Sequence, residues 1–234
     1  MFISDHDDRI NSRYYHRREY VFLGLTGIFL GSLTMLNILS LTKTVYFDLA
    51  GIPIEFVIGV LPYPITFLCT DLISEIYGKK RANAVVWVGV LLNAWVLFIL
   101  WLGDILPAKE GDNHEVFEAI KGYTYSATFA SMAAYLTAQF IDVKVFHLVK
   151  KLTKGKYLWL RNNSSTLISQ LVDSIVVTTV VYFTSDAYAG KDLFVLIYSL
   201  YLVKMAIALL DTIPFYLLVN FFNRYLHIDT KKDY

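Results

Sequence analysis

Long apolar segments alternate with short polar ones along the whole chain. Six segments are dominated by Leu, Ile, Val, Phe and Ala, at residues 20–42, 53–76, 82–103, 123–148, 164–184 and 193–222. A helix rises about 1.5 Å per residue, so about 20 residues cross the hydrocarbon core of a bilayer. The pattern predicts an all-α integral membrane protein with six transmembrane helices.

The polar segments are too short to form a further domain. We expect an N-terminal tail at 1–19, a transmembrane domain at 20–222 and a C-terminal tail at 223–234. The chain has 234 residues and is 56% hydrophobic, with a mean hydropathy of +0.49. The first 19 residues are polar and the first apolar segment is too long for a signal peptide, so this segment is expected to remain as a span.

The basic residues are distributed unevenly between the two sides of the predicted spans. Most of the 21 Lys and Arg residues fall in the tails, the second-to-third connection and the fourth-to-fifth connection. They are Arg9, Arg13, Arg17, Arg18, Lys79, Lys80, Arg81, Lys150, Lys151, Lys154, Lys156, Arg161, Arg224, Lys231 and Lys232. The positive-inside rule then predicts cytoplasmic termini and a location in the cell inner membrane. Because orientation explains these charges, we expect no nucleic-acid partner.

Small residues and prolines suggest local features of three spans. Gly24, Gly27 and Gly31 share a face of the first span, which favours close packing within the bundle over a dimer seam, although a homo-oligomer stays possible. Pro62 and Pro64 fall near the middle of the second span, where a kink would free the carbonyls of Ile58 and Val60. Pro214 in the sixth span would free the carbonyl of Leu210 in the same way. Cys69 is interpreted as a small packing residue.

Acidic and amide side chains inside the apolar spans are the main functional signal. Asp71 and Glu75 lie one helical turn apart; Gln139 and Asp142 are three residues apart, and Gln170 and Asp173 repeat that spacing. Similar short sequences around Asp142, Asp173 and Asp211 give a faint internal repeat, which could reflect two related three-helix halves or chance.

An ionised acid at the centre of a membrane costs on the order of 2.5–3.5 kcal/mol, so these acids need partners. Lys204 is the one deep cation that the pattern predicts, and it cannot neutralise them all. The alternatives are hydrogen bonds between helices, protonation, or a hydrated cavity that accepts a ligand rich in hydrogen-bond donors. We favour the cavity, lined by Asn37, Asp71, Gln139, Asp142, Gln170, Asp173, Lys204 and Asp211, with Glu75 as a gate or cytoplasmic mouth.

Enzymatic function is not supported by any motif. The chain has no HExxH pair, no glycine-rich phosphate loop and no Cys/His cluster, so neither a metal nor a cofactor is expected. Paired aspartates could suggest an intramembrane protease, but the glycine-flanked sequence of such enzymes is missing around each aspartate.

The sequence from Tyr63 to Ala82, YPITFLCTDLISEIYGKKRA, resembles the signature of the queuosine-precursor transporter family, also called the vitamin uptake transporter family. The sequence QFIDVKVF at 139–146, Asn37, the 164–173 segment, and Lys204 followed by Pro214-Phe215-Tyr216 fit the same family. The resemblance implies a secondary importer of 7-cyano-7-deazaguanine or 7-aminomethyl-7-deazaguanine, precursors in a tRNA modification pathway.

Two other functions remain open at this stage. The chain could be the substrate-binding subunit of an ATP-driven uptake complex for a vitamin or nucleobase, or a structural assembly factor. Proton coupling and facilitated diffusion are equally compatible with the surplus of acids.

Overall fold

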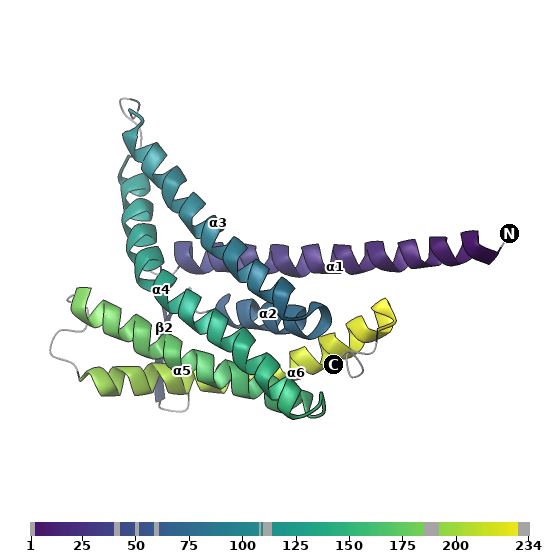
Figure 1. Ribbon diagram of the computed structural model, residues 1–234. Helices are drawn as coiled ribbons and strands as arrows, with labels where there is room; N and C mark the ends of the chain where they lie inside the picture. Colours follow the sequence, from purple (N-terminus) through teal and green to yellow (C-terminus); the bar gives the residue numbers. More distant parts are fainter. Residues whose placement is uncertain are drawn as a thin grey trace.

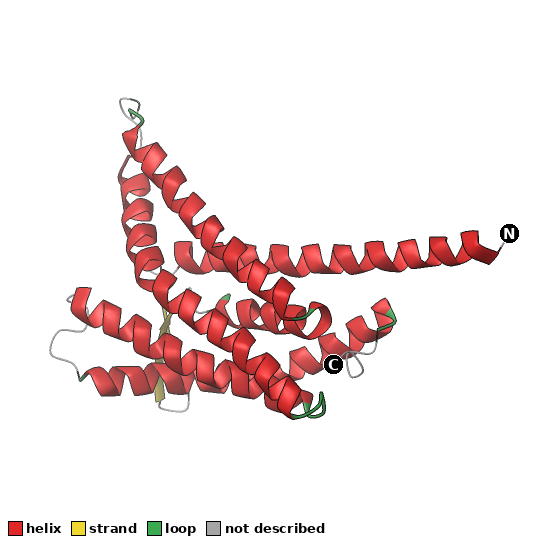
Figure 2. Ribbon diagram, in the orientation of Figure 1, coloured by secondary structure: helices red, strands yellow, loops and turns green. Residues whose placement is uncertain are grey.

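The computed structural model describes residues 3–39, 43–49, 52–58, 61–107, 109, 114–184 and 192–228. Its elements are α1 (Ile3–Leu39), β1 (Thr44–Leu49), β2 (Ile52–Val57), α2 (Tyr63–Tyr77), α3 (Lys79–Ile105), α4 (His114–Leu152), α5 (Leu158–Thr184) and α6 (Leu193–Leu226). Residues 40–42 of the first predicted span and 229–234 of the predicted C-terminal tail lie outside the described residues. The helices form a bundle accompanied by one hairpin (Figures 1 and 2).

The short helix α2 lies at the centre of the bundle. It packs against α1, α3, α4 and α6, while α5 pairs with α4 and α6. The α2–α3 turn, the α4–α5 turn and the C-terminal end of α6 lie at the same end of the bundle (Figure 1). The basic residues of the two connections and of the C-terminal end therefore lie at one end of the bundle, and the location of that end in the cytoplasm stays a prediction.

The bundle has an apolar outer surface and a partly polar interior. In the part of the chain that the structure describes, three helices are long and apolar enough to cross a membrane: Tyr15–Leu39 of α1, and α3 and α6 over their full lengths. α3 exposes Trp87, Leu91 and Trp95, as expected for a surface in contact with lipid. The other helices carry many of the buried polar side chains, which lowers their hydropathy. The coarse prediction of an all-α membrane protein is therefore supported.

The prediction of one continuous second span at 53–76 is wrong. Strand β2 occupies its first part, pairing antiparallel with β1 in register Thr44↔Val57 to Leu49↔Ile52, and helix α2 begins only at Tyr63. With 15 residues, α2 is about 22 Å long, which is shorter than the hydrocarbon core. The apolar, β-branched composition of this segment is compatible with a strand as well as a helix, and length alone did not separate the two.

The expectation that Pro62 and Pro64 kink the second span is also wrong. The two prolines stand at the beginning of α2. Pro62 is the N-cap residue and Pro64 lies in the first turn, where a missing N–H costs nothing because no helical carbonyl precedes it. The carbonyl of Ile58 is not free, because it accepts a hydrogen bond from Leu61 N at 3.1 Å. At the other end, Gly78 has φ +82°, so only glycine makes the turn into α3 without strain.

The glycines of α1 do not mediate packing within the described bundle. A Cβ atom added at Gly24, Gly27 or Gly31 would meet no atom within 4 Å, so the expectation of close helix approach at these positions is wrong. The apolar core instead contains Phe29 and Leu33 of α1, packed with Val86 of α3. Cys69 belongs to the same core, as predicted.

The close contact in this region is at Gly89 of α3. A Cβ atom there would overlap the hydroxyl of Tyr135 and would come within 3.1 Å of Leu33 Cδ2 and 3.3 Å of Phe29 Cε1. We therefore expect Gly89→Leu to destabilise the protein by about 1–3 kcal/mol through overpacking. Thermal unfolding of the purified protein in detergent measures this. Gly27→Leu is the matched control, and equal melting temperatures for the two variants would contradict the expectation.

Candidate functional site

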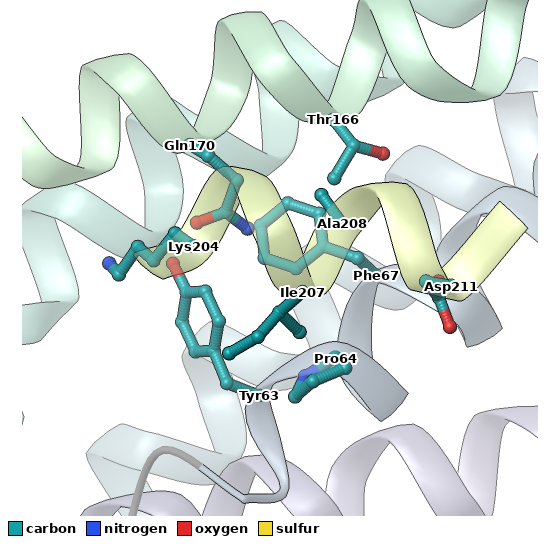
Figure 3. A pocket seen from close by; sticks show the side chains of 9 residues that line it. All are labelled: Tyr63, Pro64, Phe67, Thr166, Gln170, Lys204, Ile207, Ala208 and Asp211. Atoms are coloured by element: carbon teal, nitrogen blue, oxygen red, sulfur yellow. The ribbon is translucent and has the colours of Figure 1, made fainter. Parts of the chain in front are cut away.

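A pocket lies where α2 begins, between α5 and α6. Its free volume is about 20 Å³, room for roughly one water molecule, so the pocket has to widen before it can hold a small-molecule ligand. Its lining residues come from these three helices: Tyr63, Pro64, Phe67, Thr166, Gln170, Lys204, Ile207, Ala208 and Asp211 (Figure 3). The pocket therefore lies at the beginning of a short helix, a position at which discontinuous helices form the substrate sites of many transporters.

The polar wall of the pocket is organised around one buried ion pair. Lys204 Nζ of α6 donates to Asp173 Oδ2 of α5, and both side chains are nearly inaccessible to solvent. Lys204 Nζ also lies 4.6 Å from the centroid of the Tyr63 ring, a cation–π contact. The Tyr63 hydroxyl lies next to the side chains of Asp173 and Gln170. These contacts fix Lys204, so it does not present a free cation to the pocket.

Two pocket residues keep unused hydrogen-bonding capacity. Gln170 is 3% exposed and its Oε1 has no hydrogen-bond partner among the described residues. Asp211 is half-buried and lines the opposite end of the pocket from Lys204 (Figure 3). An amide and a carboxylate beside the apolar and aromatic walls of Phe67, Ile207 and Tyr63 suit a flat molecule with polar edges.

A second polar cluster adjoins the pocket through Thr166. Asp71 of α2 and Asp142 of α4 are completely buried, and their carboxyl groups lie next to each other. Thr166 Oγ1 donates to Asp71 Oδ2 at 3.4 Å, and Ser169 Oγ donates to Asp142 Oδ1 at 3.1 Å. Asp71 and Asp142 do not themselves line the described pocket, whereas Thr166 does.

A third cluster joins the ends of three helices near the basic connections. Glu75 of α2 forms an ion pair with Arg161 of α5 and a second one with Lys150 of α4, at 3.4 Å between Lys150 Nζ and Glu75 Oε2. Arg161 is 1% exposed, and its Nη1 also donates to the carbonyl of Gly155 at 2.9 Å. The cluster connects α2, α4 and α5 at this end of the bundle.

The remaining predicted residues lie elsewhere in the interior. Asn37 Nδ2 of α1 donates to Asn93 Oδ1 of α3 at 3.0 Å, and Asn37 Oδ1 accepts from Ser131 Oγ of α4 at 3.2 Å. Gln139 is 1% exposed, one turn before Asp142, and its Oε1 has no partner among the described residues. Neither Asn37 nor Gln139 lines the described pocket.

Sequence reasoning missed Tyr63 and Arg161. Arg161 was assigned to a polar connection, but α5 begins at Leu158 and carries Arg161 into the interior. The spacing of Glu75 and Arg161 gives no signal, since they are 86 residues apart. Tyr63 could have been noticed, because it stands between two prolines at the start of the family signature. In the described part of the chain, no group of three or more His, Cys, Asp or Glu residues could hold a metal ion.

The sequence is similar to one protein family and to two curated proteins. A family model described as "Putative vitamin uptake transporter" matches residues 57–219. A Bacillus subtilis (strain 168) protein named "Probable queuosine precursor transporter" is 29% identical over 197 residues, covering 82% of this chain and 83% of that protein. A Haemophilus influenzae protein with the same name is 27% identical over 162 residues, covering 68% of this chain and 66% of that protein. No solved structure matches.

Proposed function

Because the chain belongs to the vitamin uptake transporter family, we propose that it imports queuosine precursors across the cell inner membrane, with both termini in the cytoplasm. The substrates are 7-cyano-7-deazaguanine, 7-aminomethyl-7-deazaguanine or both. The observation that carries the proposal is the pocket between α2, α5 and α6, in which an unpartnered amide oxygen and a carboxylate stand beside aromatic walls. The protein acts as a carrier without enzymatic activity.

The proposed binding mode follows from the chemistry of a guanine-like base. Its ring N–H and exocyclic amine form an adjacent donor pair, which the carboxylate of Asp211 accepts with two hydrogen bonds. Gln170 contacts the remaining polar edge, and the rings of Tyr63 and Phe67 contact the flat face. The aminomethyl substrate adds a cation, which the surplus of acidic side chains around the pocket favours. Asp173 and Lys204 hold the wall in position.

The residues outside the pocket have supporting roles in this proposal. Asp71 contacts the pocket wall through Thr166, and Asp142 contacts Ser169, the neighbour of the lining residue Gln170, whereas Asn37 and Gln139 order the interior around the pocket. Glu75, with Arg161 and Lys150, forms a gate at the cytoplasmic end. Opening of this gate requires the ion pairs to separate, which couples the positions of α2, α4 and α5.

Uptake of labelled 7-cyano-7-deazaguanine by cells that lack both its synthesis and their own importer tests the function. We expect the protein to restore uptake of the base and the presence of queuosine in tRNA. We expect Asp211→Asn and Gln170→Ala each to lower uptake at least about tenfold, which corresponds to the loss of roughly one charge-assisted hydrogen bond. Asp104→Asn is the control, because Asp104 pairs with Lys121 at an exposed position on α3. Normal uptake by both pocket variants at wild-type expression would contradict the site.

Purified protein in liposomes separates this function from that of a subunit of an ATP-driven complex. A carrier moves labelled base down its gradient without ATP or another protein. A substrate-binding subunit retains binding but shows no entry of the base, and an assembly factor shows neither.

A further inference from the structure

Asp71 and Asp142 lie next to each other in the interior, and no side chain in the described ranges places a cation between them. Both side chains have 0% exposure. Asp71 Oδ1 and Asp142 Oδ2 each lack a hydrogen-bond partner among the described residues, whereas their other oxygens accept from Thr166 and Ser169. Ionised carboxylates only accept hydrogen bonds, so neither carboxylate can satisfy the other. One proton held between the two carboxyl groups supplies the missing donor.

The charged groups around this pair are already engaged. Lys204 of α6 pairs with Asp173 of α5, and Arg161 of α5 and Lys150 of α4 both pair with Glu75 of α2. Nearer the end of α2, Arg18 of α1 donates to the carbonyl of Ile76, and Arg81 of α3 pairs with Glu19 of α1. Two further titratable groups face the pair among the described residues, Asp211 of α6 on the side of Asp71 and Tyr63 of α2 on the side of Asp142, and neither is a cation. Among the described residues, no cation is placed to compensate Asp71 and Asp142.

We propose that Asp71 and Asp142 form a proton-binding site, and that the protein couples the entry of one proton to the entry of each substrate molecule. The inference rests on the proposed transport function and adds its driving force.

Helix α5 connects the proton site to the substrate pocket. Thr166 lines the pocket and donates to Asp71, while Ser169 donates to Asp142 and its neighbour Gln170 lines the pocket. A displacement of α5 that opens or closes the pocket therefore changes the hydrogen bonds of the acidic pair. The affinity of the pair for a proton then depends on whether the pocket is occupied, which is the requirement for coupled transport.

The proton balance of the cycle is simple. A proton from the external water forms an O–H bond to one carboxyl group of the pair, with a hydrogen bond to the other carboxylate. After the cytoplasmic side opens, the same bond breaks and the proton passes to the internal water. No bond of the substrate is made or broken. One net positive charge crosses with each neutral base, so the membrane potential as well as the pH gradient drives import.

The test uses purified full-length protein in liposomes that contain a pH-sensitive dye, with labelled 7-cyano-7-deazaguanine as the probe. With the outside one pH unit more acidic, one-proton coupling accumulates the base up to about tenfold and acidifies the interior only when the base is present. If the base equilibrates across the membrane without accumulating, and the interior is not acidified, the inference is overturned while the transport function is not contradicted. Absence of any entry, with or without the gradient, would contradict the transport function itself.

Variants of the pair locate the proton site. Asp71→Asn and Asp142→Asn are each expected to reduce the protons moved per base to zero, while exchange of labelled for unlabelled base remains detectable. Ser169→Ala removes a donor that stabilises ionised Asp142, so we expect the pH at half-maximal uptake to rise. Asp104→Asn should change neither quantity. The assignment would be overturned if both Asn variants moved protons as the wild type does, or if Ser169→Ala left the pH midpoint of uptake unchanged. The serine variant provides a result even if an Asn variant fails to fold.

Discussion

Lys204→Met is expected to abolish substrate uptake, lowering it at least about 100-fold, and to destabilise the protein by about 3–5 kcal/mol. Lys204 is the cation that pairs with Asp173, and both side chains are almost inaccessible to water. Methionine has a similar length but no charge, so Asp173 would remain ionised and unpaired or would become protonated. Either change releases Tyr63, whose ring and hydroxyl are held by this pair at the pocket wall. Uptake in liposomes and thermal unfolding in detergent measure the two effects.

The double variant Lys204→Met with Asp173→Asn separates stability from function. It removes the unpaired charge, so we expect most of the lost thermal stability to return. Uptake should stay low, because the ion pair that positions Tyr63 and Gln170 is still missing. Wild-type uptake by the double variant would contradict the role of the pair in shaping the pocket.

Arg161→Gln is expected to have the largest effect on stability outside the pocket, about 3–5 kcal/mol. Glu75 is 3% exposed, and in this variant it would retain only the longer contact with Lys150. The carbonyl of Gly155 would also lose the hydrogen bond from Arg161. Thermal unfolding and expression level in the membrane measure the loss.

Glu75→Gln with Arg161→Gln is the matched control for this cluster. Two amides can hydrogen-bond to each other, and Lys150 keeps its contact with the backbone carbonyl of residue 75, so the double variant should be more stable than Arg161→Gln alone. If Glu75 and its partners gate the cytoplasmic end, the double variant should also show a leak of substrate through the protein. If Arg161→Gln melted at the wild-type temperature, this would show that the cluster is accessible to water.

The sequence identified the acidic residues because a charge in a membrane is expensive wherever it lies. Asp71, Asp142, Asp173 and Asp211 stand out for that reason, and the structure brings them to the pocket wall or next to it. The family resemblance was also readable from the sequence and is confirmed by the family model. Arg161 was not recognised, because a basic residue near a predicted span end is ordinarily explained by membrane orientation.

The start of α2 shows why the second span was misassigned. Apolar residues continue without interruption from the hairpin into α2, so hydropathy contains no boundary between them. Pro62 and Pro64 were compatible with a kink inside a helix or with the beginning of one. The pairing of β1 with β2 decides between these, and that pairing connects residues that are not neighbours in sequence.

The sequence by itself determined the membrane character of the chain, its family and the set of charges that the interior must accommodate. These follow from local composition, because the transfer of each residue into lipid depends mainly on its own side chain. Only the tertiary structure decided which charged side chains meet. Lys204 pairs with Asp173, Arg161 pairs with Glu75, and Asp71 lies next to Asp142. Coulomb and hydrogen-bond energies depend on distances between helices, and no property of one segment specifies those distances.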